Sequence, residues 1–446
     1  MEGRLGREKI VETHVGPGNV PFGGDTPRNA ASRRSTVLHR FEHAAPLAGR
    51  TSVPFFTPGV FVLLGLALAG LVVLTIRFTH GIGAVTNLDD RYPWGLWIAV
   101  DVATGVALAA GGFTTAFIAH VLQKRKYHEL VRPALLTAML GYTFVALGVT
   151  IDLGRYYNIW HVLVPSMWQG NSAPFEVGMC VCMYLTVLYI EFLPIVCERF
   201  VGRVDLPGFL AVMNDRVDRL LRILNVSLHR TMTGFIILGV VLSCAHQSSL
   251  GTLMTIAPTK LHALWHTPVL PLQFLLSAFA VGLSMVIFES LLASWAFNRK
   301  REMNVLSPLG RLVPFLLTIY LGAKVVDLVN RDAWHFLFEP SLQQVSWWVE
   351  IGVGVLLPVL IFITHSLRRR PRYLFMAAAM VVFGVALNRI NVFIIGFQPA
   401  VGAGPYVPAV PEVLLTVGLI SILVLIYRAW VFIFPVLPVE GGHHRV

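Results

Sequence analysis

Charge is scarce in this sequence, because only 13% of its 446 residues are Asp, Glu, Lys or Arg while 55% are hydrophobic. A mean hydropathy of +0.68 excludes a soluble globular protein and is typical of a chain that lies mostly in a membrane. The formal net charge of +11 would favour nucleic acid in a soluble domain, but here the basic residues follow a membrane pattern. We therefore expect an all-α polytopic membrane protein in contact with lipid, with no nucleic-acid partner.

Cysteine is also rare and lacks the spacing of a metal site. The chain has four cysteines in or at the ends of apolar segments: Cys180, Cys182, Cys197 and Cys244. They do not show the paired spacing and loop context of zinc or iron-sulfur ligands. We expect no metal site and no iron-sulfur cluster in this chain, and interpret the cysteines as small apolar fillers.

The first 50 residues lack an apolar run long enough for a signal peptide. They contain eight Lys or Arg among many Gly and Pro, which predicts a disordered basic arm. The first membrane helix would then serve as the insertion signal. We expect residues 1–50 to form a cytoplasmic arm and residues 51–440 to form the transmembrane domain.

Ten apolar stretches follow the arm, and each is long enough to cross a bilayer at about 20 residues. They lie at about 55–79, 94–121, 131–155, 173–198, 231–257, 268–297, 308–330, 344–366, 371–396 and 410–435. The connector 200–230 places apolar and charged residues at helical spacing, which predicts an amphipathic helix on the membrane surface.

The basic residues are distributed unevenly between the two sides of these helices. Of the 35 Lys and Arg, 28 fall in segments on the N-terminal side and five on the other, while Lys324 and Arg389 lie inside helices. Positive residues collect in cytoplasmic loops. The sequence thus predicts a multi-pass protein of the bacterial inner (cytoplasmic) membrane with cytoplasmic N- and C-termini.

Two acidic positions recur at nearly equal offsets. Asp152 and Asp327 are 175 positions apart at the ends of helices 3 and 7, and Glu176 and Glu350 are 174 apart at the starts of helices 4 and 8. This predicts two repeated four-helix bundles, helices 2–5 (about 94–257) and helices 6–9 (268–396), flanked by helices 1 and 10.

His246 and Gln247 lie inside an apolar helix, about 22 Å from its start near residue 231 at 1.5 Å per residue. Such groups need polar partners or a polar ligand when they are buried in a membrane. A quinone head group, with two carbonyl acceptors, would suit them. The alternative is a core histidine bonded to a neighbouring serine or to a backbone carbonyl.

Several charged groups are expected in the outer half of the membrane, where unpaired charge is costly. Asp152 with Arg155, and Lys324 with Asp327, have the i, i+3 spacing at which each pair can neutralise itself on one helix face. Arg389, within the string NRIN at 388–391, has no acidic neighbour on its own helix. Either a ligand holds it, or it pairs across the bundle with one of three acids: Asp101, Asp152 or Glu350.

Two acids, Glu191 and Glu289, lie in the inner half of their helices. Together with His120 they can form stepping stones for protons, although Glu289 can equally reach out toward the cytoplasmic surface. The proton path that we expect comprises six acids: Glu191, Glu289, Asp152, Glu176, Asp327 and Glu350.

The histidines do not form a haem site. A membrane haem b needs facing histidines as axial ligands, and His246 is the only histidine near the middle of a helix. We therefore expect no haem, and electrons would come from a partner subunit.

Four strings carry a family resemblance: RYPWGLWI at 91–98, AHQSSLG at 245–251, LWHTPVLP at 264–271 and NRIN at 388–391. Through them, residues of about 55–435 resemble the NrfD/HybB family, the membrane subunits of iron-sulfur molybdoenzyme-like and hydrogenase complexes. The strings look most like the hydrogenase branch, often labelled a cytochrome b subunit, a label that conflicts with the histidine count.

The resemblance implies a haem-free, quinone-reactive subunit rather than a catalytic centre. A ferredoxin-like periplasmic iron-sulfur protein would deliver electrons from a catalytic subunit pair such as a nickel-iron hydrogenase to menaquinone or ubiquinone. The resemblance implies that His246 and Gln247 contact the quinone and that Asp101 and Arg389 are supporting groups. Trp94, in the aromatic segment at the outer mouth of its helix, is a further expected quinone contact. Protons can come from either side, so coupling to proton translocation stays open.

Two other functions also stay open. Repeated bundles with buried acids fit a secondary transporter or ion channel, but the helices lack the Gly/Pro-broken segments that transporters often use near mid-membrane. The chain could instead be a purely structural membrane anchor, in which the polar groups only pack the bundles.

Overall fold

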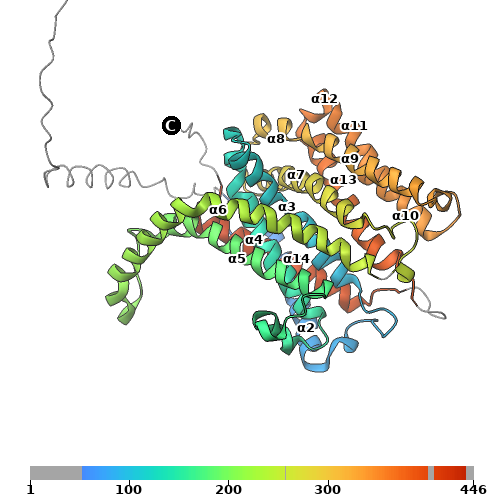
Figure 1. Ribbon diagram of the computed structural model, residues 1–446. Helices are drawn as coiled ribbons and strands as arrows, with labels where there is room; N and C mark the ends of the chain where they lie inside the picture. The colour runs from blue at the N-terminus through green and yellow to red at the C-terminus, as the bar shows by residue number, and fades with distance from the viewer. Residues whose placement is uncertain (1–52, 257, 400–405, 438–446) are drawn as a thin grey trace, which may run out of the picture. The chain divides into compact units, whose positions relative to one another are not determined.

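The computed structural model describes residues 53–256, 258–399 and 406–437. This described part is helical and contains no β-strand, only two isolated bridges. Ten of its helices are long and apolar enough to span a membrane, which confirms the expected all-α polytopic architecture (Figure 1). The predicted basic arm, residues 1–50, lies outside the described residues.

The ten spans have the following bounds: Pro58–His80 (α2), Trp97–Val121 (with α3, Gly105–Ala116), Arg125–Asp152 (with α4, His128–Asp152), Ala173–Phe200 (α5), Ala211–Thr255 (with α6, Asn214–Thr255), Leu270–Ala296 (α7), Met303–Asn330 (α8, Met303–Leu309, and α9, Leu312–Asn330), Leu342–Ile363 (α10, Leu342–Ile351, and α11, Leu357–Ile363), Pro371–Ile395 (with α13, Pro371–Ile390) and Val410–Ile433 (α14). The short helix α12 (His365–Arg368) connects α11 to α13.

Helix contacts follow chain order within each half of the described chain. In one set α3, α4, α5 and α6 pack in sequence and α6 returns to α3; in the other, α7, α9, α11 and α13 do the same. Contacts of α7 with α3 and α6 join the two sets, and α2 packs on α14. These contacts are compatible with two four-helix bundles, but the repeat that would relate them stays a prediction.

Glycine allows some helices to touch through their backbones. A Cβ placed on Gly70 of α2 would lie 2.8 Å from the Cα of Gly418 in α14. Gly354 and Gly384 meet in the same way, and a Cβ on either would overlap the other's Cα. Small residues at such crossings bring membrane helices close together. The second crossing brings the α10–α11 span onto α13, two elements that carry site residues.

α6 is one continuous helix of 42 residues. The sequence predicted a separate amphipathic helix within 200–230 and a membrane helix beginning near residue 231, and this division was wrong. Residues 209–233 contain neither Pro nor Gly, so nothing in the local sequence interrupts the helical hydrogen bonds. The amino-terminal part of α6 extends past the other helices in Figure 1.

Three membrane-spanning segments include these π-helical turns: Trp97–Thr104, Gly352–Leu356 and Asn391–Ile395. A π turn widens the helix and changes the direction of side chains, and it occurs frequently at functional sites. Asp101 lies within the first segment and Asn391 begins the third. Glu350 comes just before the second.

Candidate functional site

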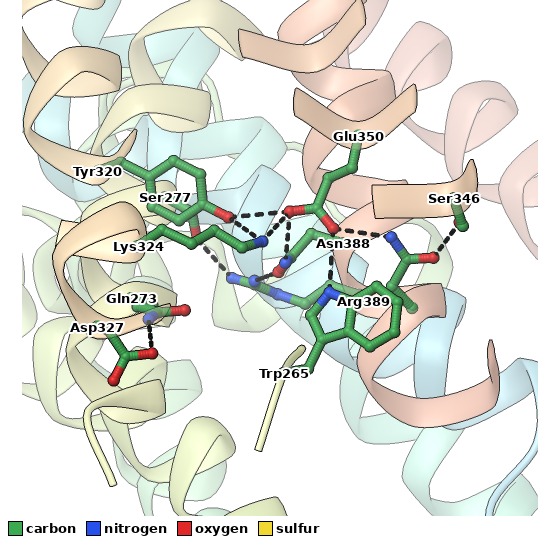
Figure 2. Close-up of polar contacts among 11 residues, drawn as sticks. Trp265, Gln273, Ser277, Tyr320, Lys324, Asp327, Ser346, Glu350, Asn388 and Arg389 are labelled. Atoms are coloured by element: carbon green, nitrogen blue, oxygen red, sulfur yellow. Dashed lines mark hydrogen bonds and ion pairs between the residues drawn. The ribbon is translucent and has the colours of Figure 1, made fainter. Parts of the chain in front are cut away.

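Glu350 is the centre of a buried polar cluster between α9, α10 and α13 (Figure 2). Its side chain accepts hydrogen bonds on both oxygens although the residue is 1% exposed. Lys324 forms an ion pair with Oε1. The same oxygen accepts from Tyr320 Oη at 3.2 Å and from Asn388 Nδ2 at 3.0 Å. Partners on two further helices therefore hold the carboxylate.

The second oxygen of Glu350 binds Asn391 and a residue of the connector between α6 and α7. Asn391 Nδ2 donates to Oε2 at 2.7 Å and Trp265 Nε1 at 3.3 Å. Trp265 reaches this position because backbone hydrogen bonds join the connector between α6 and α7 to the end of the α13 span. The His262 amide donates to Gly396 O at 2.7 Å, and the Gln398 amide donates to the carbonyl of Lys260 at 2.9 Å. The site is therefore assembled from three helices and a loop.

Arg389 lies beside this cluster and is completely buried. Its guanidinium donates from Nη1 to Asn388 Oδ1 at 2.5 Å and from Nη2 to Ser277 Oγ at 3.0 Å. The guanidinium carbon lies 3.6 Å from the ring centroid of Phe274. Within the described residues Arg389 Nε has no hydrogen-bond partner and no carboxylate lies within ion-pair distance. The cation is thus solvated by neutral groups and an aromatic face.

The sequence left Arg389 either a ligand or a cross-bundle pair with Asp101, Asp152 or Glu350. The structure shows no such direct pair in its described part; Asn388 connects Arg389 to Glu350 instead. The buried group therefore holds two cations, Lys324 and Arg389, and one carboxylate, Glu350. Burying this excess positive charge is costly unless an electron-rich group binds next to it.

Asp327 does not pair with Lys324, so that prediction was wrong. Arg331, four residues on, donates to Asp327 with Nη2 at 2.7 Å from Oδ2. Thr267 Oγ1 also donates to Asp327 at 2.5 Å. Lys324 instead extends to Glu350 on the neighbouring helix, because a long side chain can reach across a helix contact. Spacing along one helix cannot reveal such a contact.

Asp101 lies near the start of its span and Asp152 is at the end of α4, both in the first helix set. Thr416 Oγ1 of α14 donates to Asp101 Oδ2 at 2.7 Å. Asp152 is the last residue of α4, and Arg155 falls in the following turn. The expected pair of these two is absent from the ion pairs of the described residues, because the helix ends between them. Arg77 of α2 secures this helix end by donating to Ile151 O at 2.8 Å.

His246 and Gln247 are both completely buried in α6. Gln247 Nε2 donates to the carbonyl of Val106 in α3 at 2.8 Å. The ring of His246 lies 5.4 Å from that of Tyr142 in α4, centroid to centroid. In the described part of the chain, neither ring nitrogen of His246 has a hydrogen-bond partner. The local bonds that the alternative interpretation assigned to this histidine are therefore not observed.

The expected quinone contacts thus fall into two groups. His246 and Gln247 belong to the first helix set, whereas Arg389 lies next to Glu350 in the second. A chain of ring contacts connects Trp94 to Arg389: the ring of Trp94 is 6.2 Å from that of Phe393, which is 6.5 Å from that of Phe274, and Phe274 stacks on Arg389. The geometry tests none of the five expected quinone contacts, these four and Asp101, and each stays a prediction.

The six acids expected on a proton path have different surroundings. Glu289 is 9% exposed and accepts from Tyr427 Oη at 2.8 Å. It lines a cavity near the carboxy-terminal end of α7 that also involves Glu129 and Glu302. Glu176 is exposed, so it does not repeat the environment of Glu350.

Glu191 packs against α6 at a glycine. A Cβ on Gly239 would lie 2.9 Å from Glu191 Oε1. Asp327 and Glu350 are held in ion pairs, and Asp152 Oδ1 has no hydrogen-bond partner in the described chain. The path as a whole stays a prediction.

Among the described residues, neither His246 nor the pair His120 and His128 is arranged like haem ligands. His246 is the fully buried histidine of the described residues, and its ring faces Tyr142 rather than a second imidazole. His120 and His128 do face each other, but their rings are in contact at 4.7 Å, with no room for a macrocycle between them. Bis-histidine ligation requires two imidazoles on opposite sides of the iron.

Sequence reasoning missed four members of the site: Trp265, Ser277, Tyr320 and Ser346. Ser346 Oγ donates to Asn391 Oδ1 at 2.5 Å and so fixes the amide that binds Glu350. A signal was present in α9, where Tyr320, Lys324, Asp327 and Arg331 recur every three or four residues. This spacing marks one polar helix face.

Comparisons with known proteins place the chain in a family. The family model described as "Polysulphide reductase, NrfD" matches residues 84–400. A protein of Nitratidesulfovibrio vulgaris is 37% identical over 403 residues, covering 88% of this chain and 97% of the relative. The "Probable Ni/Fe-hydrogenase 2 b-type cytochrome subunit" of Escherichia coli is 32% identical over 405 residues, covering 90% and 97%.

A third relative has a name that mentions a quinone. The "Menaquinone reductase, integral membrane subunit" of N. vulgaris is 27% identical over 352 residues, covering 74% of this chain and 78% of the relative. The family match spans more than half of the chain and includes the cluster around Glu350 and Arg389. The chain therefore belongs to the NrfD family of integral membrane subunits.

Proposed function

We propose that this chain is a haem-free, quinone-reactive subunit that passes electrons between a periplasmic iron-sulfur partner and the membrane quinone pool. The partner complex that we propose is a nickel-iron hydrogenase, since one relative carries that name. A second relative, named as a menaquinone reductase subunit, supports a quinone as the electron acceptor. Menaquinone and ubiquinone present the same two carbonyl oxygens to a binding site.

The excess positive charge around Arg389 is the observation that carries this proposal. Lys324 is compensated by Glu350, whereas Arg389 donates only to neutral acceptors in the described chain. Quinone reduction adds two electrons and two protons, and negative charge develops on the carbonyl oxygens before the protons arrive. A fixed cation in a dry site stabilises such charge far more than one in water.

The surrounding residues would orient the cation and keep it available. Asn388 holds Nη1, Ser277 holds Nη2, and the face of Phe274 supports the guanidinium plane. Glu350 and its donors fix Asn388 in turn. The nearby ring of Trp94 would receive the quinone ring at the outer mouth, where aromatic side chains favour the membrane interface.

His246 forms a second candidate for the quinone site. Both of its ring nitrogens lack partners in the described residues, so the protonated nitrogen can donate to a quinone carbonyl and the other can accept from a hydroquinone hydroxyl or from water. Gln247 and Asp101 would support a head group in this half of the protein. The residue is fully buried, so a quinone could reach it only after α3, α4 and α6 move apart.

Protons for the reaction would arrive through buried acids. We propose an inner route that begins at Glu289 and the adjoining cavity, continues to Glu191 and reaches the outer acids Asp152, Asp327 and Glu350, while Glu176 would serve exchange with the outer face. Uptake from the cytoplasm for a quinone reduced near the outer face would couple turnover to the proton-motive force.

The test is quinone reduction by the complex purified with its partners. We expect Arg389→Gln to lower kcat/KM for a menaquinone analogue by at least about 100-fold, the size of effect seen when a donor to developing charge is removed. Arg389→Lys, which keeps the charge, should recover part of the rate. Dye-linked catalysis by the partner and assembly of the complex should remain intact.

The matched control is Arg132→Gln, which removes a partly exposed arginine from its surface pair with Glu198. A His246→Ala variant tests the second candidate: loss of activity there, with Arg389→Gln active, would move the quinone site to α6. Haem absorption bands arising from this subunit would contradict the haem-free proposal. Full activity in both variants would exclude Arg389 and His246 as quinone-binding residues. Absence of quinone-dependent turnover in the assembled wild-type complex would favour a structural anchor, and solute flux through the isolated chain would favour a transporter.

A further inference from the structure

Four basic side chains gather at the end of the second helix set that lies opposite Glu350. Arg311 is the residue before α9, and three others belong to the turn between α11 and α13: His365, Arg368 and Arg369. The two segments touch, because a Cβ on Gly310 would lie 3.2 Å from the ring of Phe362. Arg368 Nη1 donates to the carbonyl of the same Phe362 at 2.5 Å.

Arg368 is buried at this point and is not neutralised. It is 6% exposed, and its Nε has no hydrogen-bond partner in the described residues. Its hydrogen bonds run from Nη1 to two backbone carbonyls, those of Phe362 and Ile363. The ion pairs of the described chain do not involve Arg368, Arg311 or Arg369.

The positive charges of these four side chains repel one another. The positive charge of Arg369, with those of Arg368 and Arg311, lowers the pKa of His365 in the adjoining turn. The amino-terminal ends of α9 and α13 also lie at this end of the helix set, and their helix dipoles add partial positive charge. Cations that repel each other around a buried arginine gain stability when an anion joins them.

We infer that Arg311, Arg368 and Arg369 form a binding site for a phosphate group, the phosphodiester of an anionic lipid in the adjacent leaflet. A guanidinium matches phosphate oxygens with two parallel donors, and exposed Arg311 and Arg369 would close over an anion held above Arg368. Basic pockets between the ends of membrane helices suit lipid head groups. The site is independent of quinone chemistry and lies at the opposite end of α9 and α13.

The test is lipid binding to the full chain, purified in mild detergent and stripped of lipid. Native mass spectrometry would measure the binding of phosphatidylglycerol to the wild type and to the double variant Arg311→Gln/Arg369→Gln, in which both changed residues are exposed. We expect binding to weaken at least about tenfold, since two charge-assisted contacts are lost. Phosphatidylcholine, which has no net charge, should bind weakly to both proteins.

The control is Arg216→Gln/Arg219→Gln, which removes the same charge from exposed positions on α6 and should leave the binding of phosphatidylglycerol unchanged. Inorganic phosphate distinguishes the source of the anion. If millimolar phosphate displaces the lipid from the wild type and binds the Arg311/Arg369 variant poorly, the site takes soluble phosphate. Equal lipid binding by the wild type and that variant, or equal binding of the two lipids by the wild type, would overturn the inference.

Discussion

Glu350 accepts hydrogen bonds from five side chains: Trp265, Tyr320, Lys324, Asn388 and Asn391. It is also the carboxylate that balances part of the charge carried by Lys324 and Arg389. The two members of the ion pair are therefore not equivalent. Loss of Lys324 leaves one cation and one anion in the cluster, whereas loss of Glu350 leaves two unbalanced cations.

This asymmetry gives a prediction for stability. We expect Glu350→Gln to destabilise the chain by about 3–5 kcal/mol, the usual cost of leaving a buried charge unpaired. Lys324→Met should cost clearly less, and Glu350→Gln/Lys324→Met should be more stable than Glu350→Gln alone. Thermal unfolding of the purified chain in detergent measures all three variants as a double-mutant cycle. Equal losses in the two single variants would show that the net charge of the cluster does not matter.

The sequence identified most charged members of this cluster but not their partners. Burial in a membrane makes a Lys, Glu or Arg conspicuous within an apolar run, so Lys324, Glu350 and Arg389 were all recognised. Their contacts run between helices, and one sequence contains no information on which helix faces meet. Neutral members such as Ser277 and Tyr320 were missed because they are common in membrane helices without any function.

At the scale of elements, the crossing of Gly354 and Gly384 sets the distance between the α10–α11 span and α13. The first element carries Glu350 and the second carries Asn388, whose amide donates to that carboxylate at 3.0 Å. The backbones meet without side chains between them. The hydrogen bonds of the cluster therefore depend on two residues that take no part in its chemistry.

We expect Gly384→Ala to separate these helices and to destabilise the chain by about 1–3 kcal/mol, the cost of an overpacked core. Gly322→Ala is the matched control, because Gly322 lies in α9 with nothing within 4 Å of a Cβ built there. The control should leave the melting temperature unchanged or slightly higher, since Ala favours a helix over Gly. An equal melting temperature for both variants would mean that the crossing can relax at no cost.

The helices themselves were largely predictable, since all ten spans follow from apolar length alone. The wrong division of α6 shows where that signal ends. A change from apolar to amphipathic composition near residue 230 indicates where the chain leaves the hydrocarbon, but a helix continues past this level when no Pro or Gly interrupts it. The π turns at Asp101, beside Glu350 and at Asn391 were not predicted, because no local sequence signal marks them.

At the scale of the whole molecule, orientation decides which aqueous phase the site faces. Glu350 and Arg389 lie near the ends of their helices that carry few basic residues, and the arginines around Arg368 lie at the other end. The distribution of 28 basic residues against five predicts that the Arg368 end is cytoplasmic. An iron-sulfur partner would then have to approach from outside to deliver electrons to the Glu350 end.

Cysteine labelling from either side of the membrane tests this orientation. In a variant without the four native cysteines, we expect Trp160→Cys, in the exposed turn between α4 and α5, to react with an impermeant maleimide in intact cells. Arg203→Cys, in the exposed turn between α5 and α6, should react only after the membrane is opened. The reversed pattern would place the Glu350 end in the cytoplasm, and the partner would then have to be a cytoplasmic protein. Electron delivery from a periplasmic hydrogenase would be excluded on geometric grounds, even if quinone binding at Arg389 were retained.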